Sequence, residues 1–176
     1  MVWIVGALLL TAAVLGGAVA IWRRESNAIG WAIAQLVLVA AAGIVVLVWP
    51  HAALDASSRT SILLAVCAVV AATFGGGIVV KVVLRLSGHP MTAEDDLPAS
   101  AWIGMAERFA MTFALVIGQG AIAAVVIAVK ALGSYRGDDR GTNRVASIRV
   151  LGTLTSVIWA LLCFAVLVVA QSRMVV

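Results

Sequence analysis

The chain has 176 residues, of which 64% are hydrophobic and only 11% are charged, and its mean hydropathy is +1.14. A soluble domain carries about 25% charged residues, so the composition excludes a water-facing surface over most of the molecule. The net charge of +4 does not indicate nucleic-acid binding, because the basic residues are scattered at the ends of apolar runs. We therefore expect an all-α integral membrane protein whose main partner is the lipid bilayer.

Five apolar runs predict a bundle of about five transmembrane helices in a single domain, residues 1–176. Each run is close to the ~20 residues that cross a ~30 Å hydrocarbon core, and together they cover residues 2–21, 28–48, 61–84, 109–132 and 150–170. All three prolines lie between the runs. We expect the first run to be a retained helix, because no basic segment precedes it and Arg23 and Arg24 follow it closely.

The basic residues give the expected orientation. Five crossings place the termini on opposite faces, and each face then receives six of the 12 lysines and arginines. The arginine-rich linker 133–149 favours the cytoplasm for that segment and hence a cytoplasmic N-terminus, in a bacterial plasma membrane. The even distribution also permits insertion in both orientations as an antiparallel dimer.

A polar seam is predicted along the fourth run. Arg108, Gln119 and Lys130 are spaced by eleven residues, or about three helical turns, so they share one face of a straight helix, close to Thr112. Arg108 and Lys130 then reach opposite interfaces, while Gln119 lies near the midplane. An amide there needs a hydrogen-bond partner, so Gln119 is expected to face the bundle interior, either as a link between helices or in a wet pathway.

Two further features suggest contacts between helices. Glu107 is expected to form an ion pair with a basic residue of the third run, Lys81 or Arg85. Gly75, Gly76 and Gly77 interrupt the same run and predict a break, a hinge or a close crossing, of which close packing is the commoner use.

Motifs for chemistry are largely absent from the sequence. No catalytic residue, metal site or cofactor is predicted, because none of the standard nucleophile, phosphate-loop or zinc motifs occurs. His51 with Asp55, and His89 with the acidic segment 94–96, match no standard ligand spacing. Cys67 and Cys163 lie in apolar runs and are expected to behave as small hydrophobic residues.

The C-terminal part resembles a known family over residues 103–156. The matching residues are Gly104 to Arg108, Gly118-Gln119, Ala128 to Lys130, and Leu151 to Leu154 with Ser156. They resemble the C-terminal half of a bacterial membrane family, the domain of unknown function 3307. The chain departs from that family at Ser147, where the family usually has a glutamate. The resemblance supports Glu107, Arg108, Gln119 and Lys130 as a set and implies no mechanism.

Three functions are open on the sequence alone. The leading hypothesis is a small transporter or channel-like protein that uses the polar seam. The second is an accessory or assembly subunit of a larger membrane complex, or a homo-oligomer. The third, an intramembrane lipid-modifying enzyme with Glu107 as general base, is the weakest because no second acid–base residue is evident.

Overall fold

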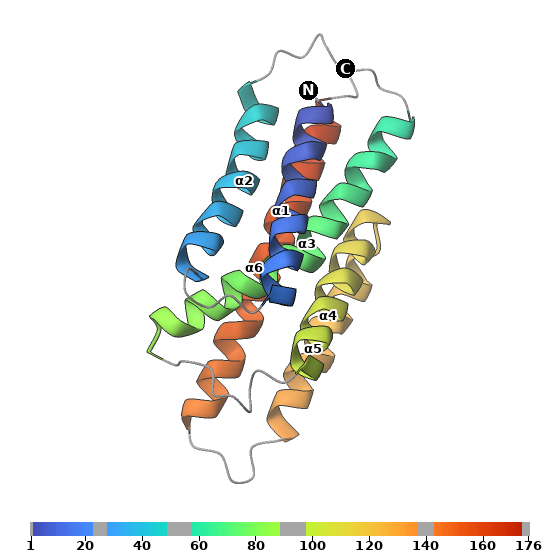
Figure 1. Ribbon diagram of the computed structural model, residues 1–176. Helices are drawn as coiled ribbons and strands as arrows, with labels where there is room; N and C mark the ends of the chain where they lie inside the picture. The colour runs from blue at the N-terminus through green and yellow to red at the C-terminus, as the bar shows by residue number, and fades with distance from the viewer. Residues whose placement is uncertain (1, 23–27, 49–57, 89–97, 137–142, 174–176) are drawn as a thin grey trace.

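The computed structural model describes residues 2–22, 28–48, 58–88, 98–136 and 143–173. These segments form α1 (Val2–Trp22), α2 (Ala28–Val48), α3 (Ser58–Leu86), α4 (Pro98–Val116), α5 (Gly120–Arg136) and α6 (Asn143–Ser172). Successive helices run in opposite directions (Figure 1). The described residues contain no strand, so the expected all-α fold is confirmed for them.

Three of the helices are long and apolar enough to cross a membrane. They correspond to Ala28–Val48 in α2, Arg59–Leu86 in α3 and Val150–Ser172 in α6, while α1 contains the shorter apolar stretch Trp3–Ala18. Large apolar side chains cover the outside of these helices, for example Val14, Ile44, Ile62 and Ile158. Water does not stabilise so much exposed apolar surface, whereas lipid does.

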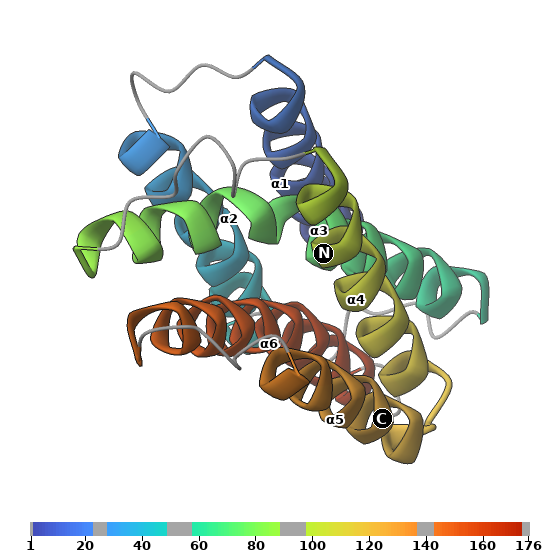
Figure 2. The same cartoon turned by 90° about the horizontal axis from the view of Figure 1, so that it is seen from below.

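The most enclosed of the three is α3, which packs against α1, α2, α4 and α6. Seen from below, it passes through the middle of the bundle (Figure 2). Glycines allow this close packing: a Cβ atom on Gly16 would lie 2.5 Å from the Phe74 carbonyl oxygen, and one on Gly75 would lie 2.6 Å from the Trp159 ring. Both views show α3 changing direction near its middle. The close crossing expected at Gly75 and Gly76 is confirmed.

The single helix expected over 109–132 is wrong, because the chain turns back at Gly118. This residue has a φ of 77°, which favours glycine. Its N–H donates to the Leu115 carbonyl at 3.0 Å, and the Gln119 N–H donates to the Ala114 carbonyl at 2.8 Å. This pair of bonds is the Schellman motif that ends many helices. The region is therefore a hairpin of two antiparallel helices, α4 and α5.

The hairpin also changes the expected topology. Because α4 and α5 begin and end at the same end of the bundle, the start of α1 and the end of α6 lie together at the other end (Figure 1). This arrangement differs from the five-crossing prediction, in which the two ends of the chain lie on opposite faces of the membrane. A hydropathy profile does not reveal this turn, because the residues around Gly118 and Gly120 are as apolar as the helices they join.

Candidate functional site

Arg108 is the most unusual residue of the bundle, because it is a charged side chain that is only 4% exposed. Its Nε and Nη2 atoms donate to the Thr73 carbonyl oxygen at 3.1 and 3.0 Å, and Nη1 donates to the Ser156 hydroxyl at 3.3 Å. Thr73 and Ser156 both lie near the midpoints of their helices, α3 and α6. Arg108 therefore links three helices at the centre of the bundle, and its expected position at a membrane interface is wrong.

The third helix makes room for this side chain. A Cβ atom on Gly76 would lie 2.8 Å from Cδ of Arg108 and 2.7 Å from the Trp159 ring. The missing side chain allows the arginine stem to lie against the backbone of α3, where it reaches a main-chain carbonyl. Such carbonyls have a second lone pair that a helix leaves available.

Glu107 forms an ion pair, but not with the residues expected from the sequence. Its Oε2 atom accepts a hydrogen bond from Nζ of Lys130 on α5, and the two side chains are 23% and 28% exposed. Lys81 and Arg85, the expected partners, lie on exposed positions of α3. The reason is the hairpin, which brings α5 back along α4 and places Lys130 beside Glu107.

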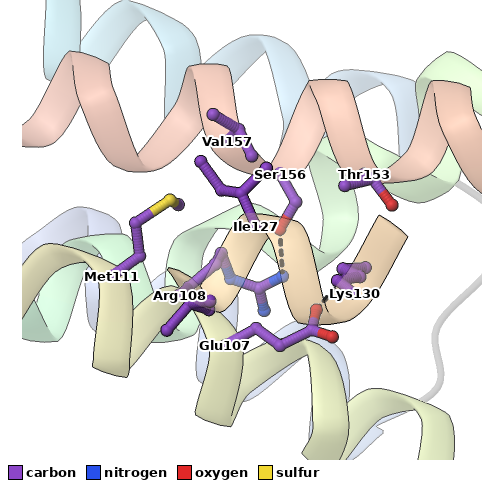
Figure 3. A pocket seen from close by; sticks show the side chains of 9 residues that line it. Glu107, Arg108, Met111, Ile127, Lys130, Thr153, Ser156 and Val157 are labelled. Carbon is purple, nitrogen blue, oxygen red and sulfur yellow. Dashed lines mark hydrogen bonds and ion pairs between the residues drawn. The ribbon is translucent and has the colours of Figure 1, made fainter. Parts of the chain in front are cut away.

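A small cavity lies between α4, α5 and α6, next to these charges (Figure 3). Its volume is about 20 Å³, which is room for about one water molecule. The surface that faces it is almost wholly apolar, and it is lined by Glu107, Arg108, Met111, Val126, Ile127, Lys130, Thr153, Ser156 and Val157.

Three charged side chains lie around the cavity. Two cations, Arg108 and Lys130, face one carboxylate, Glu107, which is held by Lys130. No carboxylate among the described residues forms an ion pair with the Arg108 guanidinium, whose protein partners are a carbonyl and a hydroxyl. Within the described segments, Arg108 is thus a buried cation whose own hydrogen-bond partners are uncharged, an arrangement that is costly in an apolar surrounding.

Two members of the predicted seam lie elsewhere. Gln119 is exposed in the turn between α4 and α5, so its expected position in the interior is wrong. Thr112 is fully buried, but its hydroxyl donates to the Arg108 carbonyl within the same helix at 2.8 Å. Because the helix ends at Val116, the eleven-residue spacing does not place Arg108, Gln119 and Lys130 on one face.

A second polar contact between helices, on α2, is not predicted from the sequence. Gln35 is 1% exposed, and its Nε2 atom donates to the Ala12 carbonyl of α1 at 2.7 Å. Its Oε1 atom has no hydrogen-bond partner within the described segments. Nearby, the indole N–H of Trp159 donates to the Ala71 carbonyl at 3.3 Å. A lone amide inside an apolar run was the available signal for Gln35, the same signal that singled out Gln119.

Other candidates lie outside the described residues, namely His51, Asp55, His89 and the acidic segment 94–96. Cys67 and Cys163 are buried thiols, as expected of small hydrophobic residues. No protein-family model, curated protein or solved structure matches the chain. The resemblance of residues 103–156 to the domain of unknown function 3307 therefore stays a prediction.

Proposed function

We propose that the protein is a small ion transporter or channel-like protein whose working site is the cavity beside Arg108. The observation that carries the proposal is a buried arginine at mid-bundle whose hydrogen-bond partners, in the part of the chain that the structure describes, are a carbonyl and a hydroxyl. Ionisable residues at membrane depth are expensive and commonly mark an ion or substrate pathway.

The proposed membrane arrangement has four crossing helices, α1, α2, α3 and α6, with the α4–α5 hairpin inserted from one side. In this arrangement the lysines and arginines are no longer divided evenly between the two faces of the membrane. By position in the sequence, nine of the twelve lysines and arginines belong to the connections α1–α2, α3–α4 and α5–α6 or to the helix ends next to them: Arg23, Arg24, Lys81, Arg85, Lys130, Arg136, Arg140, Arg144 and Arg149. Only Arg59 and Arg173 belong to the other end. The positive-inside rule then places both termini outside the cytoplasm.

Ion flux through reconstituted protein tests the proposal. Purified protein in liposomes loaded with potassium chloride is expected to release ions faster than protein-free liposomes. Arg108→Met is expected to lower the protein-dependent rate at least about tenfold while leaving the melting temperature unchanged or higher, because replacing a buried charge by an apolar side chain is often neutral or stabilising.

The matched control is Arg85→Gln, which removes a cation from an exposed position on α3. Its flux is expected to equal that of the wild type. Wild-type flux no greater than that of empty liposomes contradicts the proposal, and so does an Arg108→Met variant that conducts normally. Loss of folding in Arg108→Met points instead to a structural arginine.

Each of the two alternative functions has its own test. A larger membrane protein that co-purifies in stoichiometric amount favours an accessory or assembly subunit. The lipid-modifying enzyme requires Glu107 to act as a base, and a Glu107→Gln variant with unchanged flux and lost lipid turnover would support it.

A further inference from the structure

The turn between α4 and α5 lies deep in the proposed membrane arrangement. Figure 1 shows it between the two ends of α1 and α2, near the middle of these helices, and neither of them carries a charged residue. The hairpin therefore reverses direction within the hydrocarbon region. Backbone groups that face lipid at this depth have no water to bond with.

The turn exposes polar groups to its surroundings. Ile117, Gly118 and Gln119 are all exposed. The N–H groups of Gly120 and Ala121 have no acceptor within the described segments, and the side-chain amide of Gln119 has no hydrogen bond there. Unpaired amide groups are strongly unfavourable in hydrocarbon. We therefore expect the turn to be covered by a polar partner in the membrane.

The outer face of α5 leaves room for a neighbouring helix. The helix packs most closely on α4, and its opposite side is open. Ala124 and Ala128 are exposed about one helical turn apart, with Val125 and Val129 beside them. Small residues at this spacing let two helices approach closely in a bilayer. Lipid tails can cover such a face, but they cannot form hydrogen bonds with the turn at its end.

The chemistry of the turn selects the kind of partner. No charged residue lies between Ile117 and Val129, and donors and acceptors occur side by side there: the N–H groups that begin α5, the carbonyls that end α4, and the Gln119 amide. A fitting partner is uncharged and presents both donors and acceptors at the same depth. A second copy in the same orientation presents this set. Because an amide both donates and accepts, two copies related by a two-fold axis satisfy each other.

We infer that the protein forms a parallel two-fold dimer in which the α4–α5 turns meet through Gln119. The two α5 helices pack against each other through Ala124 and Ala128. The inference rests on the membrane arrangement of the proposed function, but it does not depend on ion flux. Dimerisation and flux are measured separately, so either can fail alone.

Single-molecule photobleaching tests the dimer, using protein with one fluorophore per chain in liposomes at a series of protein-to-lipid ratios. The wild type is expected to bleach in two steps. Gln119→Leu removes the amide and is expected to raise the dimer dissociation constant about tenfold. Ala124→Leu adds bulk where the helices meet and is expected to have an effect of similar size. Both side chains are exposed in the single chain, so neither substitution disturbs its core.

The matched control is Ala40→Leu, the same substitution at an exposed position of α2. Its dissociation constant is expected to equal that of the wild type. Oxidation of Gln119→Cys in membranes is expected to give a disulfide-linked dimer, whereas Ala40→Cys gives none. The wild type serves as the blank, because its native thiols Cys67 and Cys163 are buried.

Three outcomes overturn the inference. The first is single-step bleaching of the wild type at every ratio, in which case a larger membrane protein that co-purifies in stoichiometric amount covers the turn. The second is a dimer that neither Gln119→Leu nor Ala124→Leu weakens, because its interface lies elsewhere. The third is a Gln119→Cys variant that reacts with a water-soluble thiosulfonate and does not cross-link, which places the turn in a water-filled cavity. A dimer without ion flux overturns the proposed function alone, and flux from a monomer overturns the dimer alone.

Discussion

Two regions of the molecule use the same residue types for opposite purposes. At the crossing of α1, α2, α3 and α6, Gly16 and Gly75 remove side chains so that helices touch, and neutral groups such as the Gln35 amide tie them together. In the α4–α5 hairpin, Gly118 and Gly120 have no atoms of neighbouring helices within 4 Å, and the polar residues beside the hairpin are charged.

The difference is one of packing and charge. The crossing is dense, which suits a rigid frame, and the charged side chain of Arg108 enters it beside Gly76. The hairpin lies at the side of that frame, carries the ion pair of Glu107 and Lys130, and leaves a cavity against α6. A site with a buried charge is costly to stability, and here it is supported by helices that pack closely. Arg108 joins the site to this frame, because its guanidinium donates to the Thr73 carbonyl on α3 and to the Ser156 hydroxyl on α6.

The largest expected effect is on membrane topology, because a labelled position lies either on one face of the membrane or on the other. If the hairpin enters and leaves on one side, Ser87 at the end of α3 and Ser172 at the end of α6 lie on opposite faces of the membrane. Both residues are exposed, and the native thiols Cys67 and Cys163 are buried. In intact cells, an impermeant maleimide is expected to label Ser172→Cys from outside and Ser87→Cys only after lysis. Labelling of both from the same side restores five crossings.

The second expected effect is on stability, and it compares a glycine at a helix crossing with a glycine that faces open space. Gly16→Ala places a Cβ atom 2.5 Å from the Phe74 carbonyl oxygen and 2.7 Å from the Gly75 Cα atom, and these backbone atoms cannot rotate away. We expect a loss of about 1–3 kcal/mol in the free energy of unfolding. The control Gly30→Ala meets nothing within 4 Å and is expected to be neutral, or to gain up to about 1 kcal/mol. Equal melting temperatures for the two variants would contradict a dense crossing.

The smallest effect falls on the hairpin turn. Gly118→Ala forces an ordinary side chain into a left-handed backbone conformation with a φ of 77°, at a cost of about 1–2 kcal/mol. Gly118→Asn is expected to cost less, because asparagine tolerates this conformation. Gly120→Ala lies two residues away with a helical backbone, and it is expected to be neutral. Thermal unfolding in detergent orders the three variants, and a tolerated Gly118→Ala would argue for the continuous helix.

Much of the fold follows from the sequence because lipid imposes a simple rule. Apolar runs must become helices whose backbone groups bond internally, so the helices at 2–22, 28–48 and 58–86 were predicted to within three residues at each end, whereas α6 begins at 143 and not at 150. The hairpin was not, although its signal was present. A glycine after an apolar segment is a common helix end, but hydropathy continued through Gly118, and the eleven-residue spacing of Arg108, Gln119 and Lys130 favoured a straight helix.

The sequence by itself determined the solvent, the helical class and the importance of Glu107, Arg108 and Lys130, because charge inside an apolar run is conspicuous and costly. Only the tertiary structure decided the partners of these residues. Because the chain turns at Gly118, Glu107 pairs with Lys130 and not with Lys81 or Arg85. The same turn places Gln119 on the surface. Arg108 packs against α3 and α6, where it donates to Thr73 and Ser156. Contacts of this kind depend on how helices cross, and a crossing is set by many small side chains together, none of which is distinctive alone.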